Sequence, residues 1–180
     1  MNQSLKVRRL VEAAMIAAIY TVLTYAAAAL NLAYQGVQFR FSEALTILPV
    51  FTPSAIPGLG CFLSNLGSPM GIIDWISGTS ATLLAAVLTR LLRNLTVKGL
   101  PVLAPFPPVL TNAVIVGCVI AVTDPAGFSV PLFAAMALSV GLGELAVCYG
   151  LGLPLIAVLK KTGVSKRIFL ESQESPKRLI

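Results

Sequence analysis

Long apolar stretches separated by short charged segments make up most of the chain. Residues 13–39, 44–73, 75–89, 99–123 and 128–159 contain no charged side chain apart from Glu144. A helix of about 20 apolar residues crosses the hydrocarbon core of a bilayer, and in lipid the backbone must satisfy its own hydrogen bonds. The pattern therefore predicts an all-α integral membrane protein with a single domain that comprises residues 1–180.

The stretch 44–73 is too irregular for one straight helix. It contains Pro49, Pro53 and Pro57, followed by Gly58 and Gly60, and proline breaks or kinks a helix because it lacks a donor N–H and clashes with the preceding turn. As a single helix, residues 42–66 would be about 37 Å long at about 1.5 Å per residue. We predict two short helices here, bent at the segment VFTPSAIPG.

Basic residues cluster in three places, and these clusters predict the orientation of the chain. The clusters are Lys6, Arg8 and Arg9; Arg90, Arg93 and Lys98; and Lys160, Lys161, Lys166, Arg167, Lys177 and Arg178. The positive-inside rule places all three clusters, and with them both termini, in the cytoplasm, and a count of six crossings then places the proline corner there as well. An even number of crossings follows. We predict six transmembrane helices at about 8–32, 42–52, 54–66, 73–93, 106–123 and 129–160, and a basic cytoplasmic tail at 161–180.

Composition narrows the class of protein. Of 180 residues, 57% are hydrophobic and 11% are charged, whereas a soluble domain has about 25% charged residues. These values exclude a soluble enzyme, a disordered tail and a nucleic-acid binder, despite a net charge of +6. Histidine is absent and the three cysteines form no CxxC pair, so the sequence offers no metal site and no His-dependent catalytic site.

Polar residues within the apolar region gather toward one side of the predicted bundle. Six helices place residues 31–40, 67–71 and 124–127 on the outer side. The polar candidates at that side or near mid-depth are Arg40, Glu43, Asn65, Asp74, Trp75, Asn112 and Glu144. Ionisable groups cost several kcal/mol in a bilayer and are therefore functional candidates. We expect them to form a substrate-binding pocket that opens to the outside, with its floor near the midplane.

Structural roles are alternatives for most of these residues. Arg40 and Glu43 could pair on one helix face, and Asp74 could cap the N-terminus of its helix. Trp75 could be an interfacial anchor, and Asn112 could form an interhelical hydrogen bond. Each of these alternatives remains open at the level of the sequence.

Glu144 has the weakest structural explanation, because no basic residue lies near it in its helix. If the carboxylates of Glu43, Asp74 and Glu144 are all ionised, the single positive charge of Arg40 gives the candidate pocket a net charge of about −2. Such a site suits a cation or a ligand rich in N–H donors, such as the N1–H and 2-amino edge of a guanine. Trp75 could stack on a flat ring, and Arg40 could meet a carbonyl oxygen.

Small residues line part of the first predicted helix. Ala13 and Ala17, and likewise Ala14 and Ala18, form two overlapping small-xxx-small patterns, which let helix backbones approach closely in lipid. The pattern would suit a partner subunit, although internal packing or an alanine-rich composition explains it equally well. The chain has no GxxxxGK[ST] motif, so an ATP-driven role requires separate ATPase subunits.

Three segments together resemble a known family. They are VQFRFSEALTILP, which ends at Pro49, IIDWISGTSATLLAA at 72–86, and GELAVCYGLGLPL at 143–155. With the alanines of the first helix, they make the chain similar to the queuosine-precursor transporter (QueT) family from about Leu10 to Lys161. Members are substrate-binding S components of energy-coupling factor (ECF) transporters. The resemblance implies a six-helix bundle in the plasma membrane, cytoplasmic termini, an outer pocket gated by loops, and a 7-deazaguanine-type ligand.

The resemblance also implies partners. These are a transmembrane coupling subunit, which would contact Ala13, Ala14, Ala17 and Ala18, and two ATPase subunits that use the ATP. The S component would topple in the bilayer to present its ligand inward, with no cofactor or enzymatic activity of its own. Alternatives are an autonomous transporter or channel, an S component for another vitamin, a membrane enzyme, or a scaffold.

Overall fold

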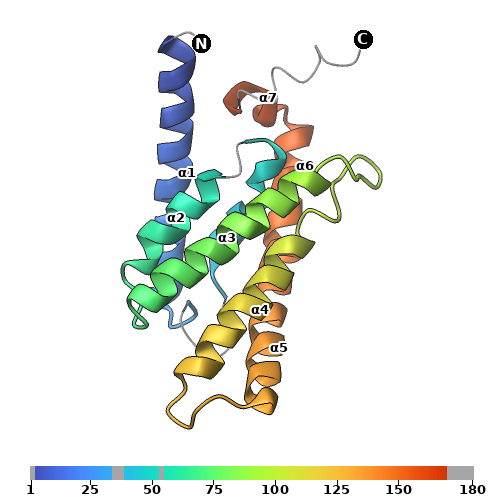
Figure 1. The fold of residues 1–180 in the computed structure, drawn as a ribbon. Coiled ribbons are helices and arrows are strands. Elements are labelled where there is room, and N and C mark those ends of the chain that lie inside the picture. Colours follow the sequence, from blue (N-terminus) through green and yellow to red (C-terminus); the bar gives the residue numbers. More distant parts are fainter. Residues whose placement is uncertain (1–2, 34–38, 53–54, 170–180) are drawn as a thin grey trace.

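The computed structural model describes residues 3–33, 39–52 and 55–169, and all regular elements in these ranges are helices (Figure 1). They are α1 (Gln3–Ala29), the 3₁₀ helices η1 (Phe41–Leu45) and η2 (Leu48–Val50), α2 (Ala55–Asn65), α3 (Ile72–Leu92), α4 (Phe106–Thr123), α5 (Val130–Val147), the π-helix η3 (Cys148–Gly152), α6 (Leu153–Lys161) and α7 (Val164–Ile168). Among the described residues, Lys6–Ala29, Ile72–Leu92, Phe106–Thr123 and Val130–Lys161 are long and apolar enough to cross a membrane. The count of six crossings remains a prediction.

The first helix ends three residues earlier than predicted, at a defined stop signal. Asn31 has a left-handed φ of 57°. Its N–H donates to the carbonyl of Ala28 at 2.9 Å, and the N–H of Leu32 donates to that of Ala27 at 2.9 Å. This is a Schellman motif, which closes the open carbonyls of a helix end. The chain therefore turns away from α1 before the apolar stretch ends.

The segment predicted as a helix at 42–52 differs from that expectation, because it forms two 3₁₀ helices. Pro49 lies at the start of η2 and cannot donate the hydrogen bond that would continue an α-helix from η1. The hydroxyl of Thr46 also donates to the carbonyl of Glu43 at 2.6 Å, which competes with regular helix bonding. Residues 53–54 of the predicted proline corner lie outside the described residues.

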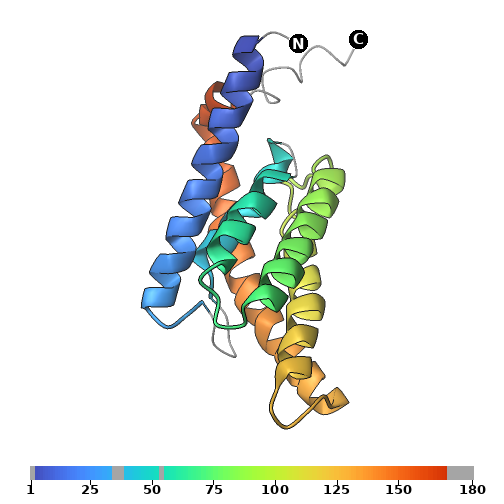
Figure 2. The ribbon, with the colours of Figure 1, turned by 60° about the vertical axis from the view of Figure 1, so that its left-hand side comes forward.

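The basic clusters share one end of the bundle. Figures 1 and 2 place the start of α1, the connection from α3 to α4, and α7 at this end, and the connections 66–71 and 124–129 at the other. Arg8 Nη2 donates to the carbonyl of Arg167 at 2.9 Å, and Lys160 Nζ donates to that of Gly99 at 2.9 Å. Lys177 and Arg178 of the predicted tail lie outside the described residues. Which end faces the cytoplasm remains a prediction.

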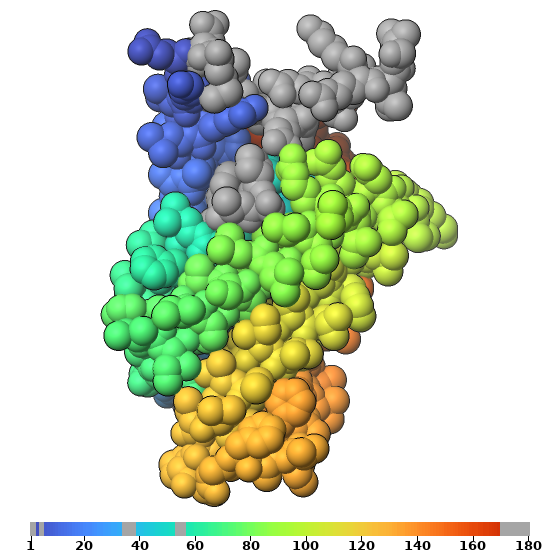
Figure 3. Space-filling model, in the orientation of Figure 1, coloured from blue at the N-terminus to red at the C-terminus, as the bar shows by residue number. Residues whose placement is uncertain are grey.

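Small residues bring the helices close together. Ideal Cβ atoms at Gly117 and Gly60 would lie 2.7 Å from Ala137 Cα and from Tyr20 Cβ, respectively, so α4 packs tightly on α5, and α2 on α1. Figure 3 shows α2, α3 and the α4–α5 hairpin forming one face of the molecule. Many large apolar side chains are exposed on the long helices, which is expected where lipid replaces water.

The 3₁₀ helix η1 and the π-helix η3 pack against each other inside the bundle. A Cβ at Gly152 in η3 would lie 2.6 Å from Ile47 Cδ1 and 3.3 Å from the carbonyl oxygen of Ala44. Cys148 Sγ lies 3.5 Å from the carbonyl oxygen of Glu43, to which it donates. The absence of a side chain at Gly152 therefore lets η1 pack against η3, and this contact places Glu43 beside the span formed by α5, η3 and α6.

Candidate functional site

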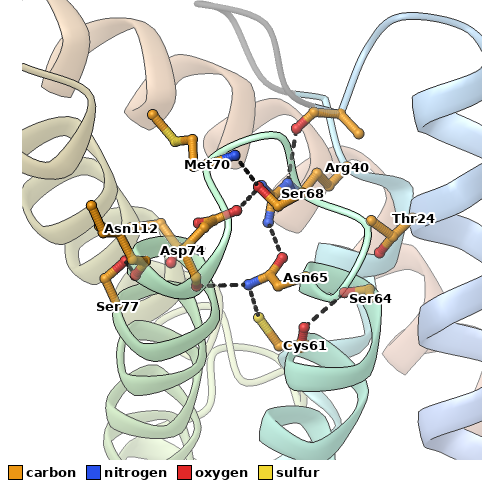
Figure 4. Close-up of polar contacts among 12 residues, drawn as sticks. Thr24, Arg40, Cys61, Ser64, Asn65, Ser68, Met70, Asp74, Ser77 and Asn112 are labelled. Atoms are coloured by element: carbon orange, nitrogen blue, oxygen red, sulfur yellow. Dashed lines mark hydrogen bonds and ion pairs between the residues drawn. The ribbon is translucent and has the colours of Figure 1, made fainter. Parts of the chain in front are cut away.

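Arg40 joins three separate parts of the chain. It lies immediately before η1 with extended backbone dihedrals, and its side chain is 6% exposed. Its Nε donates to the carbonyl of Ala33 at 2.9 Å and its Nη1 to Asn65 Oδ1 at 3.2 Å, while Nη2 lies 3.6 Å from Asp74 Oδ2 (Figure 4). The guanidinium thus connects the segment after α1 with the end of α2 and the start of α3.

Asn65 and Asp74 face each other across the turn between α2 and α3. Asn65 Nδ2 donates to the carbonyl of Asp74 at 3.2 Å and to Cys61 Sγ at 3.4 Å. A Cβ at Gly78 would lie 2.5 Å from this Nδ2, so glycine is required for the close approach. The N-cap of α3 is Gly71, and Asp74 lies in the first turn and pairs with Arg40 instead of capping the helix.

Glu43 is held between α1 and η1. The hydroxyl of Tyr20, a fully buried residue of α1, donates to Glu43 Oε1. Glu43 Oε2 is buried and accepts no hydrogen bond of good geometry from the described residues. Although Glu43 follows Arg40 by three positions, Arg40 forms an ion pair with Asp74.

Glu144 lies near the middle of the apolar span that α5 begins. Asn112 Nδ2 from α4 donates to its Oε1 at 2.9 Å, and Cys148 Sγ lies 3.5 Å from its Oε2. Asn112 also interacts with Glu43. Cys148 Sγ also lies 3.5 Å from the backbone carbonyl oxygen of Glu43, so one thiol contacts both glutamates. The surroundings of Glu43 and Glu144 are therefore continuous.

The structure brings together the polar residues that the sequence singled out. Six of them are no more than 6% exposed and form one buried polar cluster: Arg40, Glu43, Asn65, Asp74, Asn112 and Glu144. The seventh, Trp75, follows Asp74 and is half-buried. Its Nε1 is buried and has no hydrogen-bond partner among the described residues. A role of these residues in binding remains a prediction, but their convergence is a property of the fold.

The sequence analysis missed several members of the buried polar cluster. Tyr20, Cys61 and Cys148 contact its carboxyl and amide groups, and Thr46 contacts the thiol of Cys148. Each lies in an apolar stretch of the sequence, where such a side chain is typical of an ordinary hydrophobic core. A weak signal was available for Cys148, because it follows Glu144 by four positions and therefore shares its helix face.

The structure divides the small residues of α1 into two groups. Ala17 is buried, and a Cβ at Gly60 of α2 would lie 3.2 Å from its Cα. Internal packing therefore explains Ala17, and Ala13 packs against the chain's own hydrophobic core. Ala14 and Ala18 are exposed, so only these two are open to a partner.

Comparison of the chain with known protein families gives a match over most of its length. A family model described as "QueT transporter" matches residues 10–161. The matched range contains the buried polar cluster and nearly all of the four helices that are long enough to cross a membrane. Searches of curated proteins and of solved structures found no match.

Proposed function

Because the chain belongs to the QueT transporter family, we propose that it is the substrate-capture subunit of an ATP-driven importer of the ECF type. Its substrate is a queuosine precursor, a flat base of the 7-deazaguanine type, taken from the outside. The observation that carries the proposal is the burial of one arginine, three carboxyl groups and two amides in one cluster between apolar helices. Buried ionisable groups are expensive in a membrane and mark ligand pathways.

The half of the cluster around Arg40 has the chemistry to recognise a purine-like edge. The carboxylate of Asp74 accepts hydrogen bonds from neighbouring ring N–H and amino groups, as a carboxylate does from a guanidinium. Arg40 and Asn65 supply donors for a ring carbonyl oxygen. Trp75 offers an aromatic face and an N–H that has no hydrogen-bond partner among the described residues. The mixture of donors and acceptors fits a base better than a fatty acid or a phosphate.

Entry of a ligand requires movement of the segments that cover the cluster. Arg40, Asn65 and Asp74, which would bind the edge of the base, are almost fully buried. Arg40 is tied to Ala33, and Asn65 immediately precedes the connection 66–71. Opening at the connection 66–71 would expose Asn65 and Asp74 without separating the long helices. The connection 66–71 lies at the end opposite the basic clusters (Figure 1), which the positive-inside rule makes the outer end.

The proposed partners are a transmembrane coupling subunit and two ATPase subunits. The absence of a phosphate-binding GxxxxGK[ST] motif from the sequence means that ATP must be hydrolysed elsewhere. Ala14 and Ala18 offer an exposed pair of small side chains on α1, at positions where another helix could approach closely. We place the contact with the coupling subunit there.

A binding measurement tests this proposal. Detergent-purified protein is titrated calorimetrically with a 7-deazaguanine base, and Asp74→Asn is compared with the wild type. Removing the charged acceptor should weaken binding by about tenfold or more. Asp124→Asn is the matched control, because Asp124 lies in the connection 124–129 and accepts from the N–H of Ala126 at 2.8 Å, outside the cluster. Equal affinity in all three proteins would contradict the site, and transport in ATP-free liposomes would support an autonomous transporter instead.

A further inference from the structure

The short helix α7 follows α6 after a turn and is fixed to the rest of the chain on one side. Gly163, between the two helices, has a left-handed φ of 69°, which lets the chain change direction there. Phe169, directly after α7, is 4% exposed and stacks on Phe51 with ring centroids 5.4 Å apart. Arg8 Nη2 of α1 donates to the carbonyl of Arg167 at 2.9 Å. These contacts hold α7 at the basic end of the bundle (Figures 1 and 2).

The side of α7 that faces away from the protein combines positive charge with an apolar side chain. Lys166 is exposed, as is Lys161 in the last turn of α6. Ile168 is 49% exposed. We call these three side chains the α7 basic face. Cations beside an exposed aliphatic side chain are typical of a segment at a membrane surface, where the cations meet the headgroups and the apolar group enters the lipid.

Acidic side chains are nearly absent from the described elements that meet here. Residues 153–169, which include α6 and α7, contain no aspartate or glutamate. The acidic residue of α1 is Glu12, which is 7% exposed and accepts a hydrogen bond from the Thr52 hydroxyl. It is therefore directed into the protein and does not neutralise the surface. A one-signed basic surface attracts anions, and at a membrane surface these are the anionic phospholipid headgroups.

We propose that the α7 basic face binds the headgroups of anionic phospholipids of the phosphatidylglycerol type. The family match ends at residue 161, so α7 lies beyond the matched segment and the match does not account for it. A soluble phosphate would meet the two lysines but gain nothing from Ile168, whereas a lipid uses both. Because α7 is joined to α1 and to Phe51, bound lipid would also hold this end of the bundle at the membrane surface.

Two lipids that differ only in headgroup charge test the α7 basic face. The full chain in an uncharged detergent is titrated with short-chain phosphatidylglycerol or phosphatidylcholine, and thermal unfolding gives the apparent affinity. The wild type should bind phosphatidylglycerol about tenfold or more tightly than phosphatidylcholine. Lys166→Gln should weaken phosphatidylglycerol binding about fivefold and leave phosphatidylcholine binding unchanged. Lys98→Gln is the matched control, because Lys98 is exposed in the connection between α3 and α4, and its affinities should equal those of the wild type.

A third variant separates the position of α7 from its charge. Phe169→Ala removes the stacking contact with Phe51 and no charge, and it should lower the preference for phosphatidylglycerol to about the level of Lys166→Gln. The melting temperature in phosphatidylcholine reports any loss of folding separately. A full preference in Phe169→Ala would overturn the proposal, because binding would not require α7 to be held in place.

Other outcomes also contradict the α7 basic face as a lipid site. Equal affinities of the wild type for the two lipids would overturn it, as would equal losses in Lys166→Gln and Lys98→Gln, which would indicate an effect of net charge alone. Stabilisation by inorganic phosphate to the same extent as by phosphatidylglycerol would assign the face to a soluble anion instead. Unchanged lipid affinity in Lys166→Gln with reduced recovery of the ATPase complex would assign it to a protein partner.

Discussion

The hydroxyl of Tyr20 in α1 donates a hydrogen bond to Glu43 Oε1 in η1, and both residues are almost fully buried. Through this bond, the helix that carries the exposed Ala14 and Ala18 is attached directly to the buried polar cluster. Any displacement of α1 relative to η1 must break the bond or carry Glu43 along. The proposed contact with a coupling subunit and the proposed ligand site therefore share one helix.

Tyr20→Phe should destabilise the protein by about 1–3 kcal/mol, because it removes the donor and leaves a buried acceptor unsatisfied. Thermal unfolding in detergent, with and without ligand, measures the effect. Tyr25→Phe is the control on the same helix, since Tyr25 is 44% exposed. Equal melting temperatures for the two variants would show that the Tyr20–Glu43 bond contributes little to stability.

Gly78→Ala should disturb the cluster from within α3. The new Cβ would lie 2.5 Å from Asn65 Nδ2 and 3.2 Å from Asp74 Oδ1, so the Asn65 amide must move away from residue 78 and its contacts with Arg40 and Asp74 must adjust. Overpacking of this kind costs about 1–3 kcal/mol, and we expect ligand affinity to fall by more than tenfold.

The matched substitution is Gly150→Ala, because a Cβ at Gly150 meets no atom within 4 Å. Calorimetric affinities of the two alanine variants provide the comparison. Wild-type affinity in Gly78→Ala would mean that the Asn65–Asp74 contact is not needed for binding.

Ala18→Leu should reduce recovery of the complex with the coupling and ATPase subunits while ligand binding stays unchanged. Ala18 is exposed, so a larger side chain meets no atom of the chain's own core but blocks close approach by another helix. Co-purification from a membrane that contains all subunits measures the effect. Ala29→Leu is the control, as Ala29 is exposed at the other end of α1. Equal recovery of the two variants would place the coupling contact elsewhere.

A second polar network lies toward the basic end and should matter for stability only. Thr52 donates from its hydroxyl to Glu12 Oε1, and its carbonyl accepts from Arg90 Nη1 at 2.8 Å. Thr52→Val leaves Glu12 without this donor, which should cost about 1–3 kcal/mol of stability.

The control for Thr52→Val is Thr162→Val, because the Thr162 hydroxyl is exposed and bonds within its own helix turn. Ligand affinity should be the same in both variants. A large loss of affinity in Thr52→Val alone would show that the two polar networks are coupled.

Much of the helical architecture could be predicted from the distribution of charge. Uncharged apolar stretches that lie in lipid must form helices, since the backbone finds no other hydrogen-bond partners there. The expected helices at 73–93 and 106–123 accordingly match α3 and α4 within one residue. The 3₁₀ form of η1 and η2 was not predicted, because it depends on the Thr46 side-chain bond and on the contact with Gly152.

The polar cluster was predicted for the residues that are conspicuous in an apolar environment. An ionisable side chain in a bilayer has a large free-energy cost. The residues that stand out for this reason are Arg40, Glu43, Asp74 and Glu144. Their pairing was not predictable, since the contact between Arg40 and Asp74 depends on how the segment before η1 packs against the start of α3. Tyr20 was missed for the same reason, as its phenol looks like any aromatic core residue until its partner is known.

The cysteines of the wild-type chain offer the most direct test that the buried polar cluster is the ligand site. Cys61 and Cys148 contact the cluster and are buried, whereas Cys118 is exposed. Buried thiols react only when the structure opens locally. Alkylation by a small maleimide, followed by mass spectrometry at each cysteine, should therefore slow at Cys61 and Cys148 when a 7-deazaguanine base is added, with no change at Cys118. Unchanged rates at Cys61 and Cys148 under saturating base would contradict the assignment.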